Sequence, residues 1–97
     1  MRILFVDDEQ FVLDGIQRSL FDSEWEIETA NSGIEALELF DEELFDVIVS
    51  DMRMPGMDGE ELLGKIEQKY PDTVRVILSG QADQAAAIRS SFISHRW

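Results

Sequence analysis

Residues 47–59 of this 97-residue chain read VIVSDMRMPGMDG, an apolar run that stops at an acidic residue and passes into a turn-rich segment. The first three residues have the continuous apolar character of a short strand that is buried on both faces. A proline and two glycines follow within a few positions, so residues 51–59 are predicted to form a loop. Together these features predict a buried strand that presents Asp51 at its carboxyl end.

The same strand pattern recurs on both sides of this segment. Residues 3–6 form an apolar run that ends at acidic residues, and residues 74–78 form another that ends at a Ser-Gly pair. Residues 24–30 alternate between apolar and acidic side chains, which is typical of a strand with one wetter face. We therefore expect four strands, with the strand at 24–30 near a sheet edge.

Amphipathic helices are predicted between the strands. Apolar residues recur at helical spacing over residues 10–21. Ser32 and Glu35 match a capping box that opens a second helix, Asp58 can cap a third, and Asp83 can cap a fourth through residues 85–88. The apolar stripe of the second helix is expected to contain Ala36, Leu37, Phe40 and Leu44.

The order of these elements determines the fold class. Short apolar strands that alternate with amphipathic helices predict an α/β protein with a parallel sheet covered by helices on both faces. The crossovers between parallel strands are expected to be right-handed. A chain of 97 residues has the length of one domain, and we find no linker or repeat that divides it.

The composition excludes several classes of function. With 21 acidic and 8 basic side chains, the chain has a net charge of −13, which disfavours binding to nucleic acid or to an anionic membrane surface. The absence of cysteine excludes a disulfide framework and a thiolate zinc site. Because the chain shows neither a signal-peptide pattern nor an apolar run of the roughly 20 residues that span a membrane, we expect a cytoplasmic protein.

Four polar side chains come directly after the predicted strands: Asp7, Asp8, Asp51 and Ser79. The carboxyl ends of parallel strands share one rim of the sheet, where α/β proteins place their functional residues. Neighbouring carboxylates repel one another and need a cation to stay ionised together. An all-oxygen ligand set favours Mg²⁺, which would bring a phosphate group to the same rim. Each residue alone is more typical of a helix cap or a turn, so the prediction depends on their conjunction.

Three segments of the chain resemble motifs of the bacterial response-regulator receiver domains. The segment Asp7-Asp8-Glu9 is similar to the acidic pair of the family, and residues 51–59 resemble its phosphoacceptor loop almost letter for letter. Ser79-Gly80 is similar to the family's hydroxyl residue followed by a small residue. The resemblance extends from residue 2 to about residue 90 and implies a doubly wound, flavodoxin-like sheet with the strand order 2-1-3-4-5.

The resemblance also implies a role for each acidic residue. Asp51 would be the phosphoacceptor, taking a phosphoryl group from a histidine kinase or a phosphotransfer protein. Asp8, Asp51 and the backbone carbonyl of Arg53 would bind Mg²⁺ directly, and Asp7 would act through a water molecule. Such a domain is a signalling switch that catalyses its own phosphorylation, and not an enzyme with turnover.

The end of the chain departs from the family pattern. Ser79 would donate a hydrogen bond to a phosphoryl oxygen, and Gly80 would leave room beside it. The family's fifth strand ends in a lysine that pairs with the phosphate, but no lysine follows Lys69 here. We therefore expect residues 1–90 to form an incomplete receiver domain with the order 2-1-3-4, followed by an atypical tail at residues 91–97. The output domain of a regulator would be absent from this chain.

The expected loss of the fifth strand leads to a second hypothesis. The strand at 74–78 would become an apolar edge with Arg75 as its only charge, which predicts self-association through this side. The alternative function is therefore a receiver-fold interaction module that assembles without phosphorylation. A Mg²⁺-dependent phosphohydrolase with an aspartyl nucleophile is a third possibility, which fits less well because Arg53 occupies the place of its general acid.

Overall fold

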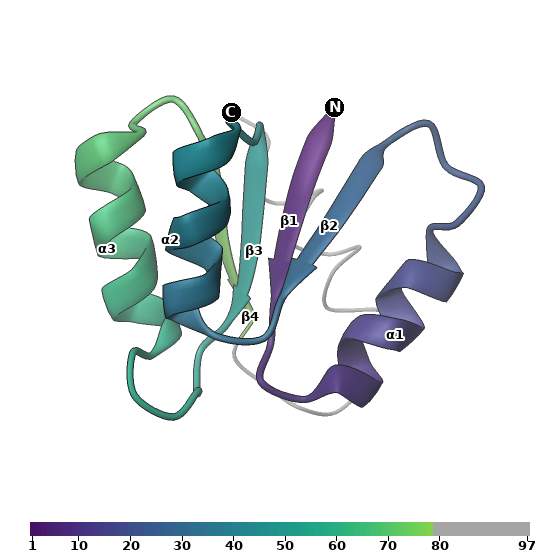
Figure 1. Cartoon of the computed structure of the whole chain (residues 1–97), viewed down its shortest axis with the longest axis horizontal. Coiled ribbons are helices and arrows are strands. Elements are labelled where there is room, and N and C mark those ends of the chain that lie inside the picture. Colours follow the sequence, from purple (N-terminus) through teal and green to yellow (C-terminus); the bar gives the residue numbers. More distant parts are fainter. Residues whose placement is uncertain (79–97) are drawn as a thin grey trace.

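The computed structural model describes residues 1–78, which alternate between strands and helices (Figure 1). The strands are β1 (Arg2–Val6), β2 (Glu26–Ala30), β3 (Val47–Asp51) and β4 (Val74–Leu78). The helices are α1 (Gln10–Ser19), α2 (Gly33–Glu42) and α3 (Gly59–Lys69). Several expectations lie outside the described residues: Ser79, Gly80, the helix after Asp83, and the boundary between a domain at 1–90 and a tail at 91–97.

The four strands form one parallel sheet in the order β2-β1-β3-β4. Val6 at the end of β1 lies opposite Ala30 on β2 and Ser50 on β3. At the other side of β3, Asp51 lies opposite Leu78 of β4. This arrangement confirms the predicted α/β class, the parallel sheet and the order 2-1-3-4. It also gathers the carboxyl ends of all four strands at one rim, the lower one in Figure 1.

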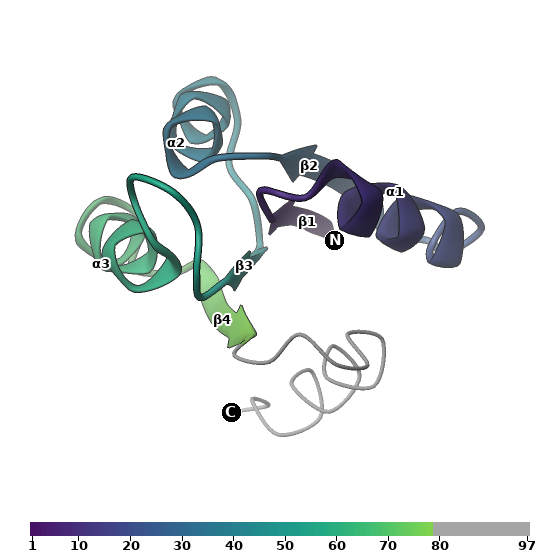
Figure 2. The same ribbon diagram turned by 90° about the horizontal axis from the view of Figure 1, so that it is seen from below.

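Helices cover both faces of the sheet, because successive residues of each strand point to opposite sides. Leu4 of β1 packs in a cluster with residues of α2 and α3, whereas its neighbour Phe5 packs in a second cluster with Leu13 and Ile16 of α1. Figure 2 shows the resulting layers, with α2 and α3 on one face and α1 on the other. This double burial explains why the strands are apolar without interruption.

Two of the predicted helix caps are present. The Ser32 hydroxyl accepts the Glu35 N–H at 3.1 Å, and the Glu35 carboxylate accepts the N–H of Asn31 at 2.8 Å. The carboxylate of Asp58 accepts the N–H of Glu61 at 2.8 Å. Each cap satisfies a donor that a helix start leaves free, so the sequence signals for the starts of α2 and α3 are correct.

The segment between α1 and β2 differs from the prediction. The helix expected over residues 10–21 ends at Ser19, and the strand expected over residues 24–30 begins at Glu26. Glu26 donates its N–H to the carbonyl of Met1, and β1 begins at the next residue, so the residues before Glu26 have no strand to pair with. The Ser23 hydroxyl accepts the N–H of residue 25 at 3.2 Å and supports a bend there.

Leu44 is not part of the α2 stripe, contrary to the prediction. The helix ends at Glu42, and Glu43 adopts an extended backbone, with φ −158° and ψ 153°. The chain therefore turns before Leu44, whose side chain is 66% exposed, and Phe45 is buried in its place at 3% exposure. The helical spacing of apolar residues in the sequence thus extends to Leu44, beyond the end of the helix at Glu42.

Candidate functional site

Three carboxylates meet at the carboxyl rim of the sheet. Asp7 and Asp8 follow β1, and Asp51 is the last residue of β3, the strand beside it. One ligand oxygen from each carboxylate lies within 4.8 Å of the other two. The fold thus brings together residues that are more than 40 positions apart, as the positions of the strand ends predict.

The three side chains differ in burial and in how firmly they are held. Asp7 is buried, Asp51 is half-buried and Asp8 is exposed. Asp7 accepts the N–H of Glu9 at 2.9 Å through its carboxylate, and its own N–H donates to the carbonyl of Ala30 at 3.1 Å. The cluster therefore has a fixed inner carboxylate and an outer one that is open to solvent.

Burial and mutual repulsion make the charges of this cluster costly. Burial raises the pKa of Asp7 above its ordinary value, the N–H of Glu9 opposes this shift, and the Asp51 and Asp8 carboxylates add to it. Burial also raises the pKa of Asp51, again with a contribution from Asp8. Within residues 1–78, no lysine or arginine forms an ion pair with any of the three. A bound cation would remove this repulsion.

The donor set fits a small hard cation. It consists of oxygen atoms alone, and Mg²⁺ in proteins takes one or two carboxylates directly while keeping several waters. The exposed Asp8 and half-buried Asp51 suit direct ligation, since both can be reached from solvent. Asp7 is anchored by Glu9 and suits contact through water.

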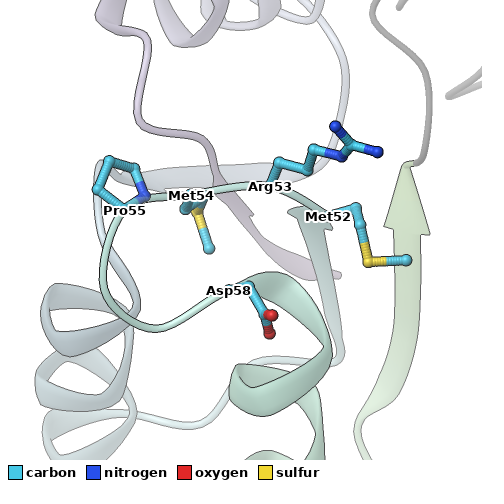
Figure 3. Close-up of a pocket in the computed structure, with 5 residues that line it drawn as sticks. All are labelled: Met52, Arg53, Met54, Pro55 and Asp58. Atoms are coloured by element: carbon cyan, nitrogen blue, oxygen red, sulfur yellow. The ribbon is translucent and has the colours of Figure 1, made fainter.

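The loop between β3 and α3 completes this part of the rim. Five of its residues line an open hollow of about 470 Å³: Met52, Arg53, Met54, Pro55 and Asp58. Figure 3 shows the Arg53 side chain directed away from Asp58, and Arg53 is exposed. Gly56 has a φ of +77°, a conformation that favours glycine, and it turns the chain back toward α3.

Two further residues of this region were missed by the sequence analysis. The hydroxyl of Ser50 is fully buried and donates to the backbone carbonyl of Asp51 at 2.9 Å. Gly59, the first residue of α3, lies directly against the same carbonyl. A polar residue inside an apolar strand was the available signal for Ser50, whereas the close approach of Gly59 depends on the three-dimensional packing.

The described helices are all too short or too polar to cross a membrane.

Comparison with known proteins agrees with this geometry. The sequence model of the response regulator receiver domain matches residues 3–92. The hydrogenase transcriptional regulatory protein HoxA of Cupriavidus necator is 38% identical over 81 residues, which are 84% of this chain and 17% of HoxA. The first curated relatives are covered to between 9% and 42% of their lengths, so this chain spans less than half of each.

Solved structures show the same fold. A response regulator receiver domain protein from Clostridium thermocellum has a TM-score of 0.76 and 35% identity, over 92% of this chain and 72% of that one. A chain from a complex of the histidine kinase ThkA with the response regulator protein TrrA has a TM-score of 0.75 and 33% identity, over 89% and 78% of the two chains. With its parallel 2-1-3-4 sheet, its acidic rim and these matches, the chain belongs to the response-regulator receiver domain family.

Proposed function

We propose that this receiver domain is a phosphorylation switch in which Asp51 accepts a phosphoryl group in the presence of Mg²⁺. The observation that carries the proposal is the approach of the Asp7, Asp8 and Asp51 carboxylate oxygens to within 4.8 Å of one another. No described lysine or arginine compensates their charge by an ion pair, which is the arrangement expected of a site that awaits a cation.

The proposed ligands of Mg²⁺ are the carboxylates of Asp8 and Asp51 and the backbone carbonyl of Arg53, with Asp7 contacting a bound water. When bound, the ion would neutralise the negative charge that the acidic rim and a phosphoryl group bring together. The chain itself supplies the positions of these oxygens, because Asp51 closes β3 and Arg53 lies two residues further along the loop.

In the proposed step, a carboxylate oxygen of Asp51 attacks the phosphorus atom of a phosphohistidine. The new bond is the P–O bond of an acyl phosphate, and the bond that breaks is the P–N bond to the imidazole. The imidazole nitrogen keeps the electron pair and takes up a proton. Asp51 is the proposed nucleophile because it is half-buried at the rim and can be reached from solvent, whereas Asp7 is buried.

Ser79 and Gly80 have further proposed roles beside this phosphoryl group. Ser79 directly follows β4, whose last residue Leu78 accepts the N–H of Met52 at 3.0 Å through its carbonyl. Because Met52 follows Asp51, the carboxyl end of β4 lies beside the phosphoacceptor. We propose that the Ser79 hydroxyl donates to a phosphoryl oxygen there and that Gly80 leaves space for it.

The proposed phosphoryl donor is a cytoplasmic histidine kinase or a phosphotransfer protein. Support comes from the structural neighbour described as a response regulator in complex with a histidine kinase. The short coverage of the curated relatives also supports an output domain outside residues 1–97. As in its family, the domain would act as a switch and not as an enzyme that turns over a substrate.

The test is covalent labelling with acetyl phosphate. With Mg²⁺, the parent protein is expected to gain about 80 Da, the mass of one phosphoryl group, in an intact-mass measurement. Asp51→Asn should gain no mass, and the parent should gain none when EDTA replaces Mg²⁺. Equal labelling of the parent and of Asp51→Asn would contradict the assignment of the phosphoacceptor.

Self-association through β4 stays a prediction. Within residues 1–78, β4 pairs only with β3, and the side chains of Val74 and Ile77 are partly exposed. Arg75, the only charge on the strand, donates to the carbonyl of Thr73 at 2.9 Å. Sedimentation velocity over a range of concentrations tests it: a concentration-dependent dimer is expected, and a monomer at the highest concentration would contradict it.

A further inference from the structure

Gly59 holds the C-terminal end of the segment Met52–Asp58 against the end of β3. A Cβ atom added to Gly59 would lie 2.2 Å from the carbonyl oxygen of Asp51 and 3.1 Å from the Cα of Met52. Real Cβ contacts essentially never fall below 3.0 Å, and both neighbours are backbone atoms that cannot rotate away. Only glycine therefore lets α3 begin this close to the end of β3.

Hydrogen bonds hold the same point of close approach. The N–H of Gly59 donates to the carbonyl of Met52 at 2.9 Å, which closes the loop into a ring. The carbonyl of Asp51 accepts the hydroxyl of the fully buried Ser50 at 2.9 Å. The backbone of Asp51 is thus fixed by a hydrogen bond on one side and by the Cα of Gly59 on another.

A second glycine holds the far part of the loop. A Cβ atom added to Gly33, the first residue of α2, would lie 2.8 Å from the sulfur of Met57 and 3.1 Å from its Cβ. Gly33 is buried, and Met57 packs at the edge of the main core cluster. The Met57 side chain therefore lies on the start of α2, in a place that a larger residue would take.

We propose that Gly59 is a positioning residue that sets the distance between the Asp51 carboxylate and the Arg53 carbonyl, and that Gly33 supports the far part of the same loop through its contact with Met57. The inference rests on the proposed function, because this carboxylate and this carbonyl are two of the three groups assigned to direct contact with Mg²⁺. Contacts that hold both oxygens in place before the ion arrives would reduce the ordering that binding requires. Groups that orient metal ligands in this way typically change metal affinity about 10- to 100-fold.

The first experiment compares two alanine substitutions in the same helix. Gly59→Ala adds a methyl group against Asp51, whereas Gly64→Ala adds one in open space, with nothing within 4 Å. Circular dichroism first establishes that each variant is folded. Mg²⁺ affinity is then measured by nuclear magnetic resonance titration. Gly59→Ala is expected to bind Mg²⁺ about 10- to 100-fold more weakly, and Gly64→Ala to bind it as the parent does.

Hydrogen exchange gives a readout that does not involve the metal. In metal-free protein, Gly59→Ala should accelerate exchange of the amide of residue 59, because its bond to Met52 is strained or lost. Gly64→Ala should leave this amide as protected as in the parent. A folded Gly59→Ala protein with unchanged Mg²⁺ affinity and unchanged exchange would overturn the proposal for Gly59.

A double-mutant cycle tests the role of Gly33. It also tests the positioning proposal if Gly59→Ala does not fold. Gly33→Ala should weaken Mg²⁺ binding about threefold or more, and adding Met57→Ala should restore part of this loss, because the two side chains compete for one space. Strictly additive effects would overturn the proposal for Gly33. A parent that neither binds Mg²⁺ nor labels at Asp51 would contradict the proposed function itself. The positioning proposal is tested separately, by the ratio of Mg²⁺ affinities between variant and parent.

Discussion

The two rims of the sheet differ in whether their charged side chains form ion pairs. At the carboxyl rim, formed by Asp7, Asp8 and Asp51, three like charges lie together without a described ion pair. At the amino rim, Arg2 forms an ion pair with Glu43 and lies 3.5 Å from Glu26. The described cation is thus paired with acidic residues at one rim, and the carboxylates of the other rim have no ion pair within residues 1–78.

Arg2 is the central cation of the amino rim. Its guanidinium lies 5.4 Å from the centre of the Phe45 ring, and its backbone N–H donates to the carboxylate of Asp46 at 2.8 Å. Nearby, the buried hydroxyl of Thr73 donates to the carbonyl of Phe45 at 2.9 Å. Most of these polar groups thus have partners, as expected of a region that stabilises the fold, whereas the buried Nε of Arg2 has none among the described residues.

Stability and the proposed function depend on different rims of the sheet. The pKa values of Asp7 and Asp51 are both raised, so their ionised forms oppose folding at neutral pH. The packing and paired charges elsewhere in the domain offset that cost. Substitutions at the amino rim should therefore lower stability and spare Mg²⁺ binding, whereas removal of a carboxylate at the carboxyl rim should weaken Mg²⁺ binding and raise the stability of the metal-free protein.

The largest effect on stability is expected from Phe40→Ala. Phe40 is 2% exposed, and its ring lies 5.0 Å from that of Phe45 and 4.9 Å from that of Tyr70. Removing it should lower the free energy of unfolding by about 3–5 kcal/mol, because a cavity remains in the core. Urea denaturation measures the change. Phe21→Ala, at a side chain that is 86% exposed, is the matched control and should change stability by about 0.5 kcal/mol or less.

A smaller loss is expected from Arg2→Met, which keeps much of the side-chain length and removes the charge. Glu43 would lose its partner and the stacking on Phe45 would weaken, at a cost of about 1–2 kcal/mol. Mg²⁺ affinity should stay at the parent value, since Arg2 lies at the opposite end of β1 from Asp7. A large fall in Mg²⁺ affinity in a folded Arg2→Met protein would show that the two rims are coupled.

The smallest and opposite effect is expected from Asp7→Asn in metal-free buffer. Burial raises the pKa of Asp7 above its ordinary value of 3.8, so the carboxylate destabilises the folded protein at pH 7. The variant should be more stable than the parent there, and the difference should shrink as the pH falls through the raised pKa. Thermal denaturation at several pH values measures this, and a variant less stable than the parent at pH 7 would contradict it.

Most of the fold could be predicted because its signals are local. The apolar runs of β1, β3 and β4 and the caps at Ser32 and Asp58 all report their own structure within a few residues. The acidic rim followed from the rule that parallel strands share their carboxyl ends. The start of β2 and the exposure of Leu44 could not be predicted, because they depend on where β1 begins and where α2 stops.

The contacts that support the acidic site also could not be predicted from the sequence. Ser50 precedes Asp51 directly, and Gly59 ends the motif that Asp51 begins. Their roles nevertheless depend on atomic distances that the sequence does not give. A glycine at the start of a helix is ordinary, and only the approach of its Cα to the Asp51 carbonyl gives it a specific meaning. Local patterns predict the candidate ligands, and tertiary packing shows what holds them.

The proposed Mg²⁺ site is tested most directly by a Mg²⁺ titration of the parent followed by ¹H–¹⁵N nuclear magnetic resonance. Saturable shifts are expected that are confined to the amides around Asp7, Asp8 and residues 51–53 and that are lost in Asp51→Asn. With a net charge of −13, the chain also offers many exposed acids that attract cations weakly. Shifts spread evenly over the acidic helix faces, without saturation at the carboxyl rim, would contradict a specific Mg²⁺ site at this rim.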